Sequence, residues 1–282
     1  MESKTIKIGM GQLLVEGGEP QRNLDRAADM TRKAAEKGCD MLLLPECLDL
    51  GWLHPTALTE SQPIPGPCSD RLCEEARRNH IYVCAGLTER AGPKVYNSAV
   101  FISSTGEILL KYRKINELVV AHEYYSIGTC LSVVETPFGM IGVSICADNY
   151  IDGLAIGHVL ARMGAQLILV PSAWTVDFSA TIEGDPYGEK WLKPFSILAR
   201  LYNLVIVSTT SVGVIVGGAY EGKKSVGQSL AVGKDGILAR GIYNEFASEL
   251  IVADIRIPHR PEKGTAIGEM LRRQGYDPSS PL

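Results

Sequence analysis

Short apolar runs alternate with stretches of helical spacing along the chain. Residues 7–14 (Lys-Ile-Gly-Met-Gly-Gln-Leu-Leu) are typical of a strand, and residues 40–45 form the next apolar run. Between them, small and apolar residues recur at the spacing of one helix face, and a glycine placed to end the helix follows: Leu24, Ala27, Ala28, Thr31, Ala34, Ala35 and then Gly38. This strand–helix–strand order predicts an α/β fold.

The same unit recurs in the second half of the chain. Three pairs of apolar segments resemble each other and follow in the same order: 38–46 with 164–172, 80–87 with 203–210, and 98–106 with 228–236. The alternative is a chance resemblance between buried strands. Three pairs in one order favour two pseudo-equivalent halves that pack sheet against sheet, with helices outside. We therefore predict an α/β fold of the four-layer α-β-β-α type.

No linker separates the two halves, so residues 1–255 are predicted to form one domain. The tail, residues 256–282, is rich in Pro, Arg and Gly and has little periodicity. It nevertheless carries apolar residues, namely Ile257, Ile267, Met270, Leu271 and Tyr276. Burial against a partner would remove these side chains from water, so we expect a homodimer or higher homo-oligomer with the tail at the interface. The alternative is a frayed terminus.

Charge and cysteine content narrow the class of protein. The net charge of −4 gives no reason to expect nucleic acid or an anionic membrane as a partner. The seven cysteines include no CxxC pair and no cluster at zinc spacing, which predicts no metal site and a reducing cytoplasm. The N-terminal residues do not have the pattern of a signal peptide, and no apolar run approaches the roughly 20 residues that span a bilayer. We expect a soluble cytoplasmic protein.

Three residues suggest covalent chemistry. Cys146 ends an apolar strand, where a strand-to-helix turn exposes a side chain at the edge of a sheet. Glu46 ends another apolar strand, and a partly desolvated carboxylate there is suited to acid–base work. Strand alternation puts Lys114 on the same face as Tyr112 and opposite Arg113. A thiol that attacks carbon needs a base and a cation, and this glutamate and lysine supply both.

The motifs around these residues resemble those of the nitrilase superfamily of carbon–nitrogen hydrolases. They are Leu-Pro-Glu46, Tyr-Arg-Lys114, and Gly142 with Cys146 and Asp148. The resemblance runs from the strand at Lys7 to the strand at Asp254 and implies the same α-β-β-α sandwich. It also implies that residues 1–255 are a carbon–nitrogen hydrolase domain that needs no cofactor.

The resemblance assigns a role to each motif residue. Cys146 is the nucleophile, and Glu46 takes its proton, gives it to the departing amine and later activates water. Lys114 and the Ala147 backbone N–H hold the oxyanion. Glu123 matches a second glutamate that many members place beside the lysine, where it would orient Lys114 and the substrate amide.

Aromatic residues that follow strand ends are the candidates for the substrate pocket. They are Trp52, Tyr150 and Trp174, with Tyr187 and Trp191 beside them. Members that cleave carbamoyl amino acids often carry an arginine shortly after the cysteine, whereas residues 148–152 contain no cation. The expected reaction is therefore hydrolysis of a small amide through a cysteine thioester, with release of ammonia or an amine. A nitrile or an N-carbamoyl amide as substrate, acyl transfer, and an inert binding or redox-sensing protein remain alternatives.

Overall fold

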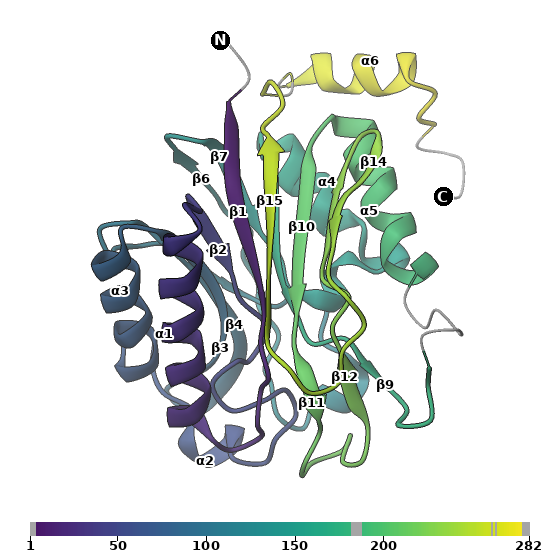
Figure 1. Ribbon diagram of the computed structural model, residues 1–282. Helices are drawn as coiled ribbons and strands as arrows, with labels where there is room; N and C mark the ends of the chain where they lie inside the picture. The colour runs from purple at the N-terminus through teal and green to yellow at the C-terminus, as the bar shows by residue number, and fades with distance from the viewer. Residues whose placement is uncertain (1–3, 182–187, 261, 263, 278–282) are drawn as a thin grey trace.

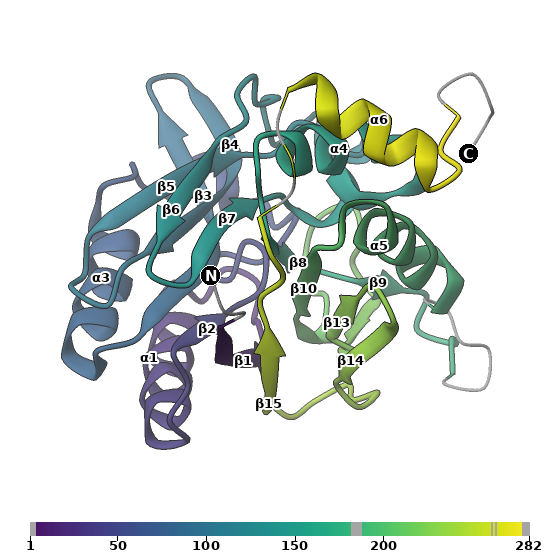
Figure 2. The ribbon, with the colours of Figure 1, turned by 90° about the horizontal axis from the view of Figure 1, so that it is seen from above.

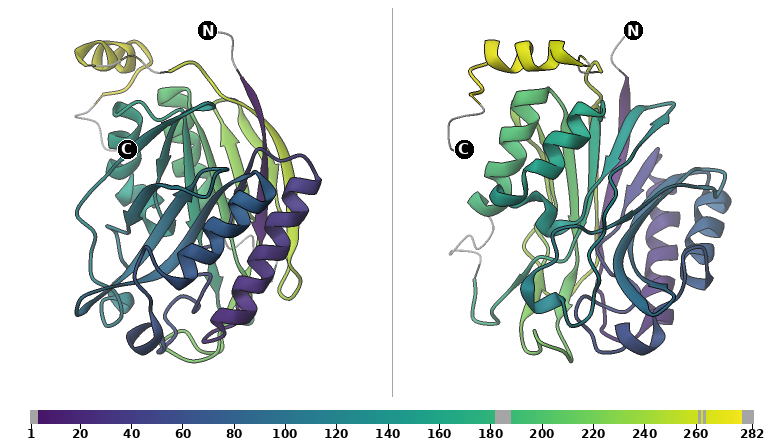
Figure 3. Two further views of the ribbon diagram at one scale, coloured as in Figure 1. Left: turned by 90° about the vertical axis from the view of Figure 1, so that its left-hand side faces the viewer. Right: turned by 180° about the vertical axis from the view of Figure 1, so that it is seen from behind.

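Two six-stranded sheets pack face to face at the centre of the protein (Figure 1). The computed structural model describes residues 4–181, 188–260, 262 and 264–277. Helices α1 (Pro20–Glu36) and α3 (Pro67–Asn79) cover the outer face of one sheet, and α4 (Ala155–Arg162) and α5 (Gly188–Tyr202) cover the other. The view from behind in Figure 3 shows the resulting four layers, so the predicted α-β-β-α fold is confirmed.

The two sheets have matching strand orders. The first runs β15 (Glu249–Arg256), β1 (Thr5–Gln12), β2 (Met41–Leu43), β3 (Tyr82–Ala91), β4 (Lys94–Ile102), β5 (Ile108–Arg113). The order in the second sheet is given from β6, the strand that corresponds to β15. It runs β6 (Val133–Thr136), β7 (Gly139–Val143), β8 (Leu167–Ser172), β10 (Val205–Thr210), β13 (Leu230–Gly233), β14 (Gly236–Arg240). In each sheet three parallel strands are flanked by one antiparallel strand and an antiparallel hairpin.

The predicted internal repeat corresponds to these strands. Segments 38–46 and 164–172 contain β2 and β8, the second strand of each parallel set. The other two pairs contain β3 with β10 and β4 with β13. The pseudo-equivalent halves are thus confirmed, with one addition. The last of the described strands, β15, joins the sheet of the first half by pairing with β1.

Separate apolar cores hold the layers together. The core between the sheets includes Ile8 and Phe101 of one sheet and Ile168 and Ile206 of the other. A second core lies between the first sheet and its two helices, where α1 contributes the apolar face that its spacing predicts: Leu24, Ala27, Met30 and Ala34. Burial of such faces stabilises these helices more than their intrinsic propensity does.

Short elements gather at one end of the sandwich, the lower end in Figure 1. They include helix α2 (Ala57–Glu60) and a small sheet with the order β11 (Val212–Val214), β12 (Lys224–Val226), β9 (Thr175–Val176). The described residues also include three short 3-10 helices: η1 (Val119–Ala121), η2 (Cys146–Asn149) and η3 (Ile151–Gly153).

The tail is more ordered than its sequence suggests. It contains helix α6 (Thr265–Arg273), which lies across the upper end of the sandwich in Figure 1 and is seen from above in Figure 2. Ile257, Ile267 and Leu271 are buried against the core of their own chain. These three side chains therefore do not need a partner subunit in order to be buried. The sequence does not predict this helix, because nine residues are too few to show a clear helical repeat of apolar positions.

Within the described residues, the structure has no helix that is both long enough and apolar enough to span a membrane.

Candidate active site

Glu46 lies at the junction between the two sheets. It follows β2, and its backbone N–H donates a 3.2 Å hydrogen bond to the carbonyl of Ser172 at the end of β8. Gly86 of β3 permits this position, because a Cβ atom there would come within 2.5 Å of the Glu46 Cα. Only 1% of Glu46 is exposed. The carboxylate is thus fixed between the halves rather than solvated on a loop.

Lys114 follows β5 and meets Glu46 directly. Its Nζ lies 2.7 Å from Glu46 Oε1, and the same oxygen accepts a 2.6 Å hydrogen bond from Asn97 Nδ2. The Lys114 backbone N–H donates to the Asn97 carbonyl at 2.9 Å. The predicted alternation is confirmed, because Tyr112 and Lys114 are buried while Arg113 is only half-buried.

A second carboxylate, Glu117, faces the same lysine. Its Oε2 lies 3.6 Å from Lys114 Nζ, and its side chain is completely buried. Burial, partly offset by Lys114, raises the pKa of Glu117 to about 7. Burial lowers the pKa of Lys114, but the nearby carboxyl groups of Glu117 and Glu46 raise it by more. The pKa of the lysine therefore lies well above its usual value. The lysine is therefore a permanent cation held between two carboxyl groups.

Cys146 opens the 3-10 helix η2, just after β7. Its φ of +41° is rare for a residue with a side chain and turns the backbone sharply at this point. The backbone N–H of Ala173 hydrogen-bonds to its sulfur. Burial and the nearby Glu46 raise the pKa of the thiol despite the opposing effect of Lys114. The resting sulfur is therefore protonated, so it needs Glu46 to take its proton as it attacks.

Asp148 ties the nucleophile turn to the strand that carries the lysine. Its buried carboxylate accepts hydrogen bonds from Tyr112 Oη at 2.8 Å and from the backbone N–H groups of Asn116 at 2.8 Å and Ile145 at 2.9 Å. The aspartate of the cysteine motif thus serves as a brace between the two halves.

Glu123 does not lie beside Lys114. The chain turns through η1 after the lysine, and in the next turn Ala121 and Tyr125 point inward while Glu123 is exposed. This corrects the placement expected from the sequence, because the second carboxylate that faces the lysine, besides Glu46, is Glu117. Its spacing of three residues from Lys114 is the only sequence signal for this pairing.

Aromatic side chains surround the catalytic candidates. The Trp52 ring lies 5.7 Å from Lys114 Nζ and makes an edge contact with Tyr220 at 5.2 Å. Tyr150 contacts Trp191 at 5.0 Å, and Trp191 stacks on the deeply buried Trp174 at 4.5 Å. The remaining pocket candidate from the sequence, Tyr187, lies outside the described residues.

Two groups that take part in the site are hard to recognise from the sequence. Asn97 is a polar residue in the middle of an apolar strand, which is a weak hint of a partner. Ala173 acts through its backbone, so its residue type carries no information. As for metal ions, no group of three or more His, Cys, Asp or Glu residues in the described part of the chain could hold one.

Comparison with known proteins identifies a family. The carbon–nitrogen hydrolase profile matches residues 7–259. The chain is 30% identical over 181 residues to "Omega-amidase NIT2" of Xenopus tropicalis, and 29% identical over 182 residues to the protein of that name from Mus musculus. These matches cover 61% of this chain, and 64% and 65% of those proteins, which is less than two thirds of their length.

Solved structures share the fold. An amidase from Nesterenkonia sp. AN1, described with acrylamide added to its active-site cysteine, superposes with a TM-score of 0.76 at 23% identity, covering 89% of this chain and 93% of that one. Another structure of a Nesterenkonia sp. amidase gives 0.77 at 21% identity and covers 98% of both chains. The likeness therefore extends over the whole sandwich.

Proposed function

The chain belongs to the carbon–nitrogen hydrolase family of the nitrilase superfamily, and from this we propose that it hydrolyses small amides through a thioester on Cys146. The observation that carries the proposal is the buried contact of Lys114 with Glu46 beside the Cys146 thiol. A base, a cation and a nucleophile are thereby brought together from both halves of the fold.

Acylation begins when Glu46 takes the thiol proton while the Cys146 sulfur attacks the amide carbon. Lys114 and the Ala147 N–H stabilise the oxyanion, and one such donor is typically worth about 3–4 kcal/mol of barrier. Glu46 then gives its proton to the departing nitrogen and the C–N bond breaks. Ammonia or an amine leaves, and the acyl group remains on sulfur.

Deacylation returns the enzyme to its starting state. Glu46 takes a proton from water as the water oxygen attacks the thioester carbon. The C–S bond breaks, the carboxylic acid is released, and the proton returns to Cys146. Glu117, whose carboxylate lies 3.6 Å from Lys114, keeps the lysine charged and orients it, as the family resemblance expects of Glu123.

The aromatic rings and the charged groups around the thiol limit the class of substrate. Trp52 and Tyr150 supply apolar walls, with Trp174 behind them. Charged groups around the thiol are mainly carboxyl groups: Glu46, Glu117 and Asp148 against Lys114. This balance favours an amide whose acyl chain is neutral or cationic.

Ammonia release from a panel of matched amides and nitriles tests the function. We expect at least one amide to release ammonia and to leave an acyl adduct on Cys146 in the intact-mass spectrum. Cys146→Ala should abolish both, whereas Cys130→Ala, which changes an exposed thiol, should leave activity unchanged. Activity on nitriles alone, or ammonia release by Cys146→Ala, would contradict the proposal.

We further propose a cytoplasmic homodimer made of a hydrolase domain, residues 1–255, and a tail at the interface. All seven cysteines are free, which suits a reducing compartment. Val159 of α4, which is 42% exposed, and Ile151 of η3, which is 41% exposed, are apolar side chains on the surface and support self-association. Removing residues 259–282 and measuring the solution mass tests this, because an unchanged dimer would exclude the tail from assembly.

A further inference from the structure

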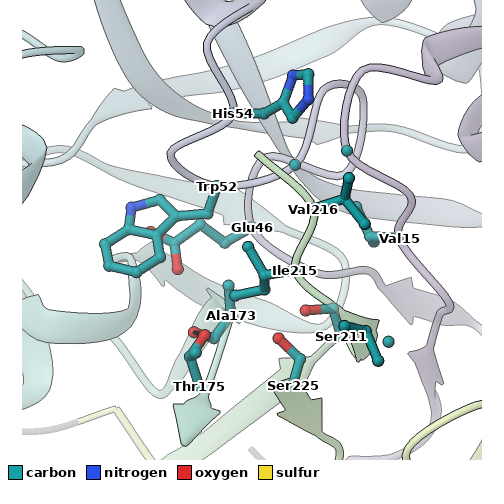
Figure 4. Close-up of a pocket in the computed structure, with 14 residues that line it drawn as sticks. Val15, Glu46, Trp52, His54, Ala173, Thr175, Ser211, Ile215, Val216 and Ser225 are labelled. Carbon is teal, nitrogen blue, oxygen red and sulfur yellow. Dashed lines mark hydrogen bonds between the residues drawn. The ribbon is translucent and has the colours of Figure 1, made fainter. Parts of the chain in front are cut away.

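A short backbone segment at the end of β8 contacts two of the catalytic groups. The Ser172 carbonyl accepts the 3.2 Å hydrogen bond from the Glu46 N–H, and the N–H of the next residue, Ala173, bonds to the Cys146 sulfur. Ala173 and Glu46 line the same pocket, which Figure 4 shows in close-up. The position of this segment therefore affects both the base and the nucleophile.

The hydroxyl of Thr210 holds the segment just beyond the strand. β8 ends at Ser172, which pairs with Thr210, the last residue of β10. Two residues further on, the Trp174 N–H donates a 2.8 Å hydrogen bond to the side-chain Oγ1 of Thr210. Thr210 is completely buried. A side chain thus continues the attachment between the two strands after their backbone ladder has ended.

A chain of buried hydrogen bonds holds Thr210 in turn and reaches the other sheet. The Thr210 N–H donates to Ser229 Oγ at 3.1 Å, and this hydroxyl donates to Oε1 of Gln12, on β1, at 3.0 Å. All three residues are fully buried. Gly227 and Gly241 leave room for the Gln12 amide, because a Cβ atom at either glycine would come within 2.6 Å of it. Buried hydrogen bonds that are all satisfied make a site rigid, so Thr210 is firmly placed.

We propose that Thr210 is a positioning residue whose hydroxyl fixes the backbone that carries the Ala173 N–H to the Cys146 sulfur. The inference rests on the proposed function and adds to it a residue that lies outside the catalytic motifs. During acylation the thiol proton passes to Glu46 while the sulfur bonds to the acyl carbon, and the N–H stabilises the negative charge on sulfur. The same N–H assists deacylation, when the C–S bond breaks and the electron pair returns to sulfur.

Thr209 offers a matched control on the same strand. It is also completely buried, but its hydroxyl makes no hydrogen bond with any residue that the structure describes. Successive side chains of a strand point to opposite faces, so Thr209 faces away from the side that Thr210 serves. Valine has nearly the shape of threonine and lacks the hydroxyl. The two valine variants therefore separate the loss of this hydrogen bond from the loss of a buried hydroxyl.

The experiment measures thiol reactivity and turnover in parallel. Iodoacetamide alkylates Cys146 by forming a C–S bond with loss of iodide and of the thiol proton, and peptide mass spectrometry distinguishes this site from the exposed Cys130. We expect Thr210→Val to slow this alkylation and to lower kcat by about 10- to 100-fold with little change in KM, because the displaced N–H acts on sulfur. Thr209→Val should match the wild type in all three quantities.

Alkylation also separates positioning from a structural role. A fold that is merely loosened would expose the buried thiol and speed its alkylation, whereas a displaced Ala173 N–H slows it. Circular dichroism and urea unfolding establish that each variant is folded under the assay conditions.

Two further variants decide the matter if Thr210→Val is poorly folded. Thr210→Ser keeps the hydroxyl and should recover most of the lost rate. Ser229→Ala removes the acceptor of the Thr210 N–H and should slow alkylation and turnover in the same direction, but by less.

Other outcomes overturn the proposal. They are wild-type alkylation and kcat in Thr210→Val, an equal loss in Thr209→Val, and a loss that Thr210→Ser does not recover. A rise in KM at unchanged kcat would instead assign Thr210 to substrate binding. Failure of the proposed function is distinguishable, because a protein that releases no ammonia from any amide would still show the difference in Cys146 alkylation between the two valine variants.

Discussion

The hydroxyl of Tyr112 donates a 2.8 Å hydrogen bond to the carboxylate of Asp148. Tyr112 lies on β5, two residues before the lysine, and Asp148 lies two residues after the nucleophile. The contact therefore sets the distance between the cation of one half and the thiol of the other.

Tyr112→Phe should lower both stability and rate. It leaves a buried carboxylate with one donor fewer, which costs about 1–3 kcal/mol of unfolding free energy. We expect kcat to fall more than KM rises, because the reacting groups lose their alignment. Urea unfolding and steady-state kinetics measure these effects. Tyr96→Phe, a change in another buried tyrosine, should leave both near wild type.

Glu117 and Glu123 offer a matched pair of substitutions. Glu117→Gln removes the buried carboxylate beside Lys114, and we expect kcat/KM to fall by about 10- to 100-fold. Glu123→Gln changes an exposed carboxylate six residues further along and should stay within twofold of wild type. A larger loss in the Glu123 variant would show that the sequence had assigned the role correctly.

The raised pKa of Glu117 also has a consequence for stability. Because the carboxyl binds its proton more tightly in the folded state, its stabilising contribution is full below pH 4.5 and is lost as pH rises through 7. The Glu117→Gln variant has no titratable group at this position, so it does not lose stability in this way as the pH rises. The unfolding free energy of the variant minus that of the wild type should therefore increase from pH 5 to pH 8, by at most about 3 kcal/mol. A flat difference would mean that Glu117 has an ordinary pKa.

Lys114→Met should destabilise the protein strongly. It leaves Glu46 and Glu117 buried without their cation, and breaking a buried pair in this way costs about 3–5 kcal/mol. Adding Glu117→Gln should restore part of the lost stability, since one carboxylate fewer remains uncompensated. Activity should stay lost in the double variant. If the second substitution lowers the urea midpoint further, the two carboxyl groups do not share the lysine.

The sequence predicts those parts of the site that carry local motifs. Glu46, Lys114 and Cys146 each stand at the end of a periodic apolar strand, and the repeated strands predict the two sheets. Asn97, Glu117 and the Ala173 N–H depend instead on which strand ends meet across the sandwich. Glu123 was chosen by its position in a motif, but the turn at η1 exposes it.

The tail shows a second limit of sequence patterns. Helix α6 has only two fully buried apolar side chains, Ile267 and Leu271, too few to define a period. Their burial depends on contacts with helices that lie far away in the chain. The sequence shows no segment against which these residues could pack, and for that reason they were assigned to an interface. In the folded protein they pack against other parts of the same chain.

Strand β15 completes the sheet of the first half although it follows all the other described strands in the sequence. Until it arrives, β1 presents an open edge of backbone N–H and C=O groups to other chains. A fragment that ends after β5 would carry the base and the cation but keep that edge. Such a fragment is therefore expected to aggregate when made alone and to regain solubility and activity when the remainder of the chain is supplied separately.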